Sequence, residues 1–125
     1  MSQLSPTSPT LFFTKNDSLD PRWGELVTQN LAHSPIWGLV GYCDDLGIIL
    51  NGGRPGAHQA PSKIKEFFYK MTPSYELWTK TEGQLKEKIC DLGDVIPEKS
   101  IHGISPSEIL KNKSNYISEL EKNQQ

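Results

Sequence analysis

The feature that most constrains the fold is an alternation of apolar runs with helical patterns. Ile36–Tyr42 is an almost continuously apolar run, as expected for a strand that is covered on both faces. Lys88–Val95 is a second, shorter strand candidate, followed by Pro97. A helical pattern follows each run, and the order strand, helix, strand, helix predicts parallel pairing with right-handed crossovers, which is an α/β fold.

Two helices are predicted with some detail. Pro61–Met71 has apolar residues at positions i, i+3, i+4 and i+7, which predicts an amphipathic helix with one buried face. The residues of that face are Ile64, Phe67, Phe68 and Met71. Ser105 and Glu108 form a capping-box pattern around Pro106, and they predict the start of a last helix with Ile109, Leu110, Tyr116, Ile117 and Leu120 on one broad face.

The remaining segments are less regular. We expect residues 1–15, rich in Ser, Thr and Pro at their start, to be a disordered arm, and residues 16–125 to be one portion of a single α/β domain. A short helix is predicted within Asp17–Asn30, with Asp20 as its N-cap and Pro21 at its first position. Residues 74–87 suggest a loop or a weak helical turn.

Two strands are too few for a stable parallel sheet, because such a sheet covers little apolar surface. The chain is therefore expected to be a piece of something larger.

Composition excludes several classes. The net charge of −2 comes without a basic stripe, so nucleic-acid binding has no support. No apolar run reaches the length of a membrane span, and the start shows no signal-peptide pattern, so we expect a cytoplasmic protein. Cys43 and Cys90 match no metal or redox spacing and are expected to be reduced, semi-buried thiols.

The densest chemical signal is the run Asn51-Gly52-Gly53-Arg54-Pro55-Gly56-Ala57, between the first strand and the helix that begins near Pro61. Glycines let a backbone approach a ligand, helix N-termini favour anions, and arginine can hold a carboxylate with two hydrogen bonds. The spacing fits neither a Walker loop nor a dinucleotide fingerprint. The plainer interpretation is a tightly turned connection in which Arg54 binds a carbonyl or an acid.

This region resembles the arginase/agmatinase/formiminoglutamase (ureohydrolase) family. The similar stretches are Leu39–Gly47, Asn51–Ala57 and Ala60–Lys65, with Asp20–Val27 and Asp91–Asp94 in the same order. The Asn-Gly-Gly-Arg form looks most like the formiminoglutamase branch. Ala60 and Lys65 stand where the family usually has Gly and Arg.

The resemblance implies the N-terminal part of a partial three-layer, arginase-like fold. It also implies a hydrolase of guanidino or formimino compounds, in which two manganese ions activate a bridging water. The family's metal-ligand motifs do not occur in this sequence, so we expect this chain to bind no metal and to be inactive alone. Within the family, the loop after the first strand rims the substrate pocket, which implies that Asn51, Gly52, Gly53 and Arg54 bind substrate.

Other polar residues carry weaker signals. His33, His58 and His102 are scattered and are expected to be unrelated loop residues. Adjacent carboxylates at Asp44 and Asp45 could hold a cation, but a turn-capping role is favoured. Asp91 and Asp94 are expected to cap turns at the second strand.

Two alternatives remain open. One is a non-catalytic interaction or scaffold protein that kept the front of the fold and completes its sheet as a homo-oligomer or on a full-length relative. The apolar Ile48–Leu50 segment and the final capping box favour it. The other is a small anion- or nucleotide-binding module that uses the glycine loop.

Overall fold

A three-stranded mixed sheet organises the chain in the computed structural model, which describes residues 3–80, 84–97 and 104–123. Its strands are β1 (Gln3–Ser5), β2 (Trp37–Tyr42) and β3 (Ile89–Ile96). The order is β1-β3-β2, with β2 parallel and β1 antiparallel to the central β3. Both predicted strands and their parallel pairing are confirmed, and the fold is mixed α/β.

The pairing of β2 with β3 contains an irregularity. Leu39 pairs with Asp91 but Val40 pairs with Gly93, so Leu92 is an extra residue in β3. Gly93 has a φ of 90°, and a Cβ atom there would collide with the backbone carbonyl of Ser5 in β1. Glycine is therefore required at this bulge, which lets all three strands approach one another.

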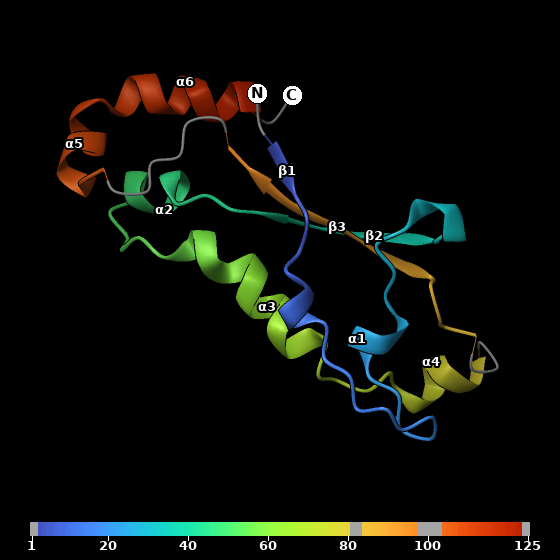
Figure 1. The fold of residues 1–125 in the computed structure, drawn as a ribbon. Helices are drawn as coiled ribbons and strands as arrows, with labels where there is room; N and C mark the ends of the chain where they lie inside the picture. Colours follow the sequence, from blue (N-terminus) through green and yellow to red (C-terminus); the bar gives the residue numbers. More distant parts are fainter. Residues whose placement is uncertain (1–2, 81–83, 98–103, 124–125) are drawn as a thin grey trace.

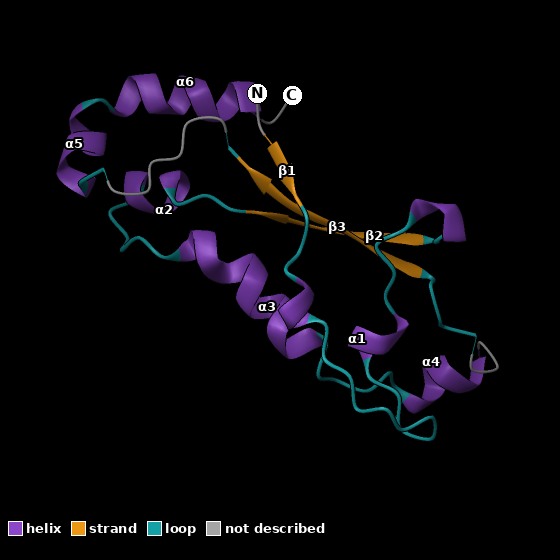
Figure 2. Cartoon of the chain, in the orientation of Figure 1, coloured by secondary structure: helices purple, strands orange, loops and turns teal. Residues whose placement is uncertain are grey.

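The described residues form six α-helices. These are α1 (Trp23–Leu26), α2 (Leu46–Leu50), α3 (Ala60–Phe68), α4 (Tyr75–Lys80), α5 (Pro106–Lys111) and α6 (Lys113–Asn123). Short 3-10 turns lie at Pro9–Leu11, Leu31–His33 and Ala57–Gln59. Helices α1, α3 and α4 lie on one side of the sheet, and α2, α5 and α6 gather near the carboxyl ends of β2 and β3 (Figures 1 and 2). None of the helices in the described part of the chain is long and apolar enough to span a bilayer.

Two separate apolar clusters hold these layers together. The larger is built on Trp23, Leu26, Tyr69 and Leu85, and joins the sheet to α1 and α3. The smaller is built on Leu46, Ile49 and Ile109, and joins α2 to α5. The apolar Ile48–Leu50 segment therefore belongs to a short helix, α2, that the sequence did not predict.

The N-terminal predictions were wrong in two respects. Gln3–Ser5 form β1, and Thr7 is buried, so the expected disordered arm contributes to the sheet. The predicted helix shrinks to α1, whose N-cap is Arg22 rather than Asp20. The Asp20 carboxylate instead binds the side chains of Arg22 and Lys15.

The helix predicted over 61–71 exists as α3, but most of its predicted buried face points outward; Phe68 is the exception, since it is half-buried and stacks on Trp23. Ile64, Phe67 and Met71 are exposed by 64%, 65% and 57%, whereas Lys65 and Tyr69 are buried. The reason is a set of polar contacts that Lys65 makes with β3, described below, which fix the rotation of the helix about its axis.

The last helical region begins as predicted and then divides. The Ser105 hydroxyl accepts a hydrogen bond from the Glu108 backbone N–H at 3.3 Å, and Pro106 is the first helical residue. A break at Asn112 separates α5 from α6. Ile109 is buried on the predicted face, Tyr116 is half-buried, and Leu110 and Ile117 are exposed.

Candidate functional site

The glycine loop lies at the carboxyl end of β2, where parallel α/β sheets place their ligand sites. The chain leaves β2 at Tyr42, forms α2, turns through residues 51–56 and enters α3. Asn51, Gly52, Gly53 and Arg54 are all exposed. No described residue is a hydrogen-bond or ion-pair partner of the Arg54 side chain, so none of them is the carbonyl or acid that the plainer interpretation gives it.

Asp45 fastens this loop to the end of the strand. Its Oδ1 atom accepts hydrogen bonds from the backbone N–H groups of Gly56, at 3.0 Å, and His58, at 2.9 Å. Its Oδ2 atom lies 2.6 Å from His58 Nδ1. Asp45 is buried, and Gly56 has a φ of 138°, a backbone conformation that glycine adopts without strain. The turn-capping role is therefore the one that Asp45 plays.

The surroundings of Asp45 favour the ionised form of its carboxyl group. Burial raises its pKa, but the hydrogen bonds from His58 and Gly56 outweigh burial and hold the pKa below the ordinary value. His58 is consequently not an unrelated loop residue, as its sequence position suggested. His33 lies apart from this site, with its Nδ1 atom 2.9 Å from Thr28 Oγ1, and His102 lies outside the described residues.

A second polar cluster, which sequence reasoning missed, is buried between α3 and β3. The Lys65 ammonium group lies 2.7 Å from Asp94 Oδ1 and 2.9 Å from Asp91 Oδ1. It also donates to Thr7 Oγ1, at 2.6 Å, and the Tyr69 hydroxyl donates to Asp91 Oδ2. Three segments far apart in sequence thus meet at one ammonium group.

These contacts correct the roles predicted for the two aspartates. Asp91 does accept the Gly93 backbone N–H at 2.8 Å, as a turn-capping residue would, but it is also an ion-pair partner of Lys65. Burial raises the pKa of Asp91, but the hydrogen bonds from Tyr69 and Lys65 lower the pKa by more than burial raises it. The pKa of Asp91 is therefore below its ordinary value. The only signal in the sequence was the i, i+4 spacing of Lys65 and Tyr69, which places both on one helix face.

The described residues do not fit a pair of metal ions. No group of three or more His, Cys, Asp or Glu side chains within the described ranges is arranged to hold a metal. Asp91 and Asp94 share the Lys65 ammonium, which occupies the position a cation would take between them. Both oxygens of Asp45 are engaged by the loop. These side chains therefore do not form a metal site that could take part in catalysis.

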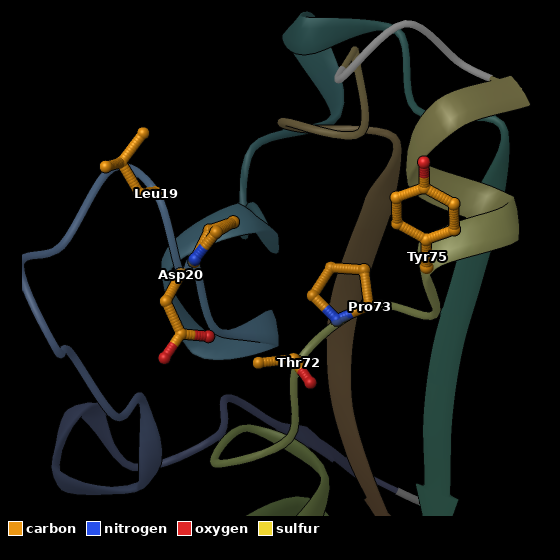
Figure 3. Close-up of a pocket in the computed structure, with 6 residues that line it drawn as sticks. Leu19, Asp20, Thr72, Pro73 and Tyr75 are labelled. Carbon is orange, nitrogen blue, oxygen red and sulfur yellow. The ribbon is translucent and has the colours of Figure 1, made fainter.

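A pocket elsewhere contains one carboxylate, which is already in an ion pair. It has a volume of about 320 Å³ and lies near α1 and α4, away from the glycine loop (Figures 1 and 3). Figure 3 shows Leu19, Asp20, Thr72, Pro73 and Tyr75 along its wall. Its one carboxylate, Asp20, is already paired with Arg22 at 2.8 Å. The two cysteines are buried, free thiols, and burial raises the pKa of each.

Comparison with known proteins identifies relatives of one kind. The formimidoylglutamase of Salmonella heidelberg (strain SL476) is 31% identical over 113 residues, which is 82% of this chain and 33% of that protein. That of Citrobacter koseri is 26% identical over 107 residues, 78% of this chain and 31% of the relative. That of Psychrobacter cryohalolentis is 40% identical over 58 residues, 46% and 17% of the two chains.

These matches confirm the resemblance to the formiminoglutamase branch. The chain spans about a third of the length of the curated relatives it matches. No family profile and no solved structure matches the chain.

Proposed function

Because this chain is similar to formimidoylglutamases over 82% of its length, we propose that it forms the N-terminal part of a manganese-dependent, arginase-like hydrolase domain. The substrate of the whole domain is formimidoylglutamate or a related guanidino or amidine compound. The metal ions belong to the part of the domain that has no counterpart here. On this proposal the isolated chain does not hydrolyse the substrate.

In the proposed enzyme, this chain positions the glycine loop, residues 51–56, for contact with the substrate. The loop follows a parallel strand at its carboxyl end, and the buried Asp45 carboxylate holds the loop to that strand end. Arg54 is exposed and is not engaged by another described side chain, so its guanidinium group is available to a substrate carboxylate. Arginine binds carboxylates through two parallel hydrogen bonds, which orients the substrate. Asn51 lies at the end of α2 beside this position.

The test is a fused protein. This chain replaces the matching third of the Salmonella heidelberg enzyme, and hydrolysis of formimidoylglutamate is measured with Mn²⁺. We expect the fused protein to hydrolyse the substrate and the isolated chain not to. A folded fused protein without activity would refute the proposal.

Arg54→Ala in the fused protein is expected to raise KM with a smaller effect on kcat, because it removes binding shared by the ground state and the transition state. Arg54→Lys should give an intermediate KM, because it keeps the charge and loses the two-point geometry. Gln59→Ala, also exposed near the loop, is the control and should leave KM unchanged. An unchanged KM with a less stable Arg54→Ala protein would instead assign Arg54 a structural role.

A second candidate, an interaction protein, is favoured by one observation. Ile64 and Phe67 of α3, and Met71 just after it, expose large apolar side chains. The Ile48–Leu50 segment no longer favours it, because Ile49 is buried against the α5 cluster and Leu50 packs beside it. Self-association of the isolated chain, measured by sedimentation, would support this candidate.

A further inference from the structure

The glycine run begins with the dipeptide Asn51-Gly52, and Asn51 is the one asparagine of the sequence that a glycine follows. The side-chain amide of an asparagine can react with the backbone nitrogen of the next residue, because a five-membered ring forms. A side chain on that next residue hinders the attack, and glycine has none. This chemistry is one reason why asparagine is a thermolabile residue. The most reactive asparagine context of the sequence therefore lies in the candidate substrate loop.

The reacting pair is open to solvent. Asn51 and Gly52 are both exposed, and a methyl group placed on Gly52 would meet no atom within 4 Å. No described residue is a hydrogen-bond partner of the Asn51 side chain. Asn112, which ends α5, is exposed as well, but its Nδ2 atom donates to the Glu108 carbonyl at 3.3 Å. Asn51 is thus the less restrained of these two helix-ending asparagines.

The attacking nitrogen is held in the turn that ends α2. The Gly52 N–H group donates to the Ile49 carbonyl at 2.9 Å, and the Gly53 N–H group donates to the Ile48 carbonyl at 2.8 Å. This pair of hydrogen bonds is the common C-terminal motif of helices. The Gly52 nitrogen is therefore free to turn toward Asn51 Cγ only when the end of α2 opens.

Helix α2 is held by few contacts. It has five residues, and helices of this length are not stable by themselves in water. Its buried side chains, Leu46 and Ile49, pack with Ile109 of α5 in the smaller apolar cluster (Figure 1). A region with little buried apolar surface opens at a low free energy, so the end of α2 is expected to open without unfolding of the sheet.

We propose that Asn51 is a site of spontaneous modification, at which aspartate or isoaspartate forms at a rate set by the opening of α2. The Gly52 nitrogen forms a bond to Asn51 Cγ. The bond from Cγ to Nδ2 breaks, and Nδ2 leaves as ammonia with the proton of the Gly52 N–H group. Water then opens the ring: attack at Cγ gives aspartate, and attack at the backbone carbonyl carbon gives isoaspartate. Water is the only other reactant.

Both products change the candidate site. Each adds a carboxylate to the loop that carries Arg54, and isoaspartate also adds a methylene group to the loop backbone. The new carboxylate repels an anionic substrate and competes with it for the Arg54 guanidinium group. The modification therefore raises KM as the enzyme ages. This consequence rests on the proposed function, whereas the modification itself does not.

The first test incubates the full chain at physiological temperature and pH and follows the loss of each amide by peptide mass spectrometry. Asn112 is the internal control, because it also ends a short helix but precedes Lys113. Conversion at Asn51 is expected to be about tenfold faster or more. It should accelerate further in urea, where α2 is unfolded. Equal rates at the two asparagines, or no acceleration in urea, would overturn the proposal.

Two glycine variants separate the chemistry from the opening of α2. Gly52→Ala, measured in urea, adds a side chain beside the attacking nitrogen and should slow conversion by about tenfold. Gly47→Ala, measured in the folded chain, adds a methyl group that meets nothing within 4 Å, stabilises α2 and should slow conversion severalfold. An unchanged rate in Gly52→Ala would exclude attack by this nitrogen. An unchanged rate in Gly47→Ala would show that α2 does not control the reaction.

The consequence for binding is tested in the fused protein. Asn51→Asp reproduces one product and should raise KM severalfold, whereas Asn112→Asp adds the same charge on α5, outside the glycine loop, and should leave KM unchanged. An active fused protein with equal KM for both variants would overturn the effect on substrate binding. A folded fused protein that is inactive in every form would refute the proposed function, and conversion in the full chain would still establish the modification site.

Discussion

The ammonium group of Lys65 on α3 lies 2.9 Å from Oδ1 of Asp91 on β3, and both side chains are buried. Asp94, Thr7 and the Gly93 carbonyl also contact this ammonium group, so β3, α3 and the segment after β1 are joined at one point. Removing one partner of such a cluster leaves the others charged or polar without compensation.

Lys65→Met should therefore destabilise the chain by about 3–5 kcal/mol, because it leaves two buried carboxylates unpaired. Urea unfolding measures this change. Lys63→Met is the matched control on the same helix, since Lys63 is exposed and its ion-pair partner among the described residues is Glu66, at 3.1 Å. The control should be close to wild type, because exposed ion pairs contribute little. Similar losses for both variants would contradict the role of Lys65.

Asp45→Asn should loosen the glycine loop. The substitution removes the charge that accepts hydrogen bonds from Gly56 and His58, and the expected loss is about 1–3 kcal/mol. Amide exchange of Gly56 and His58 should accelerate more than exchange in β3. Asp44→Asn, at the neighbouring half-buried position, is the control and should change stability by less than about 0.5 kcal/mol.

Stability should fall in acid. Asp45 and Asp91 have pKa values below the ordinary 3.8 in the folded chain, so near that pH the unfolded chain binds more protons. The stabilisation by these carboxylates is thus complete above the unfolded pKa and is lost as the pH falls through the folded values. The urea midpoint should be lower at about pH 3 than at about pH 6. Asp45→Asn should reduce the difference, and a higher midpoint in acid would contradict the assignment.

Two glycines should respond to alanine in opposite directions. Gly93→Ala should be strongly destabilising, because φ is 90° and the added methyl group meets the Ser5 carbonyl. Gly47→Ala in α2 meets nothing within 4 Å and should stabilise by up to about 1 kcal/mol. Thermal unfolding compares the two. Destabilisation by both would show that α2 does not tolerate a side chain at residue 47.

The sequence pattern predicted β2 and β3 because each contains a local run rich in apolar residues. It failed on the rotation of α3 because two faces of that helix compete. Ile64, Phe67 and Met71 form the more apolar face, but Lys65 and Tyr69 reach partners on β3 that lie 26 and 22 residues farther along the chain. The short strand β1 was missed because its three residues carry no periodic signal and are stabilised by pairing with Asp94–Ile96.

The sequence pattern placed the glycine run in the chain but did not reveal the contacts that hold it. The run Asn51–Arg54 is where the pattern placed it, after the first strand and before the helix. The contact of Asp45 with His58 could not be inferred from spacing, because it depends on how the loop closes. The proposed binding role of Arg54 remains a prediction for the kinetic test.

The separation of the two apolar clusters has a consequence for the loop. Helix α2, which leads directly into Asn51, is anchored in the smaller cluster with Ile109 of α5, whereas the sheet belongs to the larger one. A region with less buried apolar surface opens at a lower free energy than the rest of the chain. We therefore expect the loop, α2 and α5 to open as one unit, so that a ligand bound to the loop would also suppress local unfolding of α5.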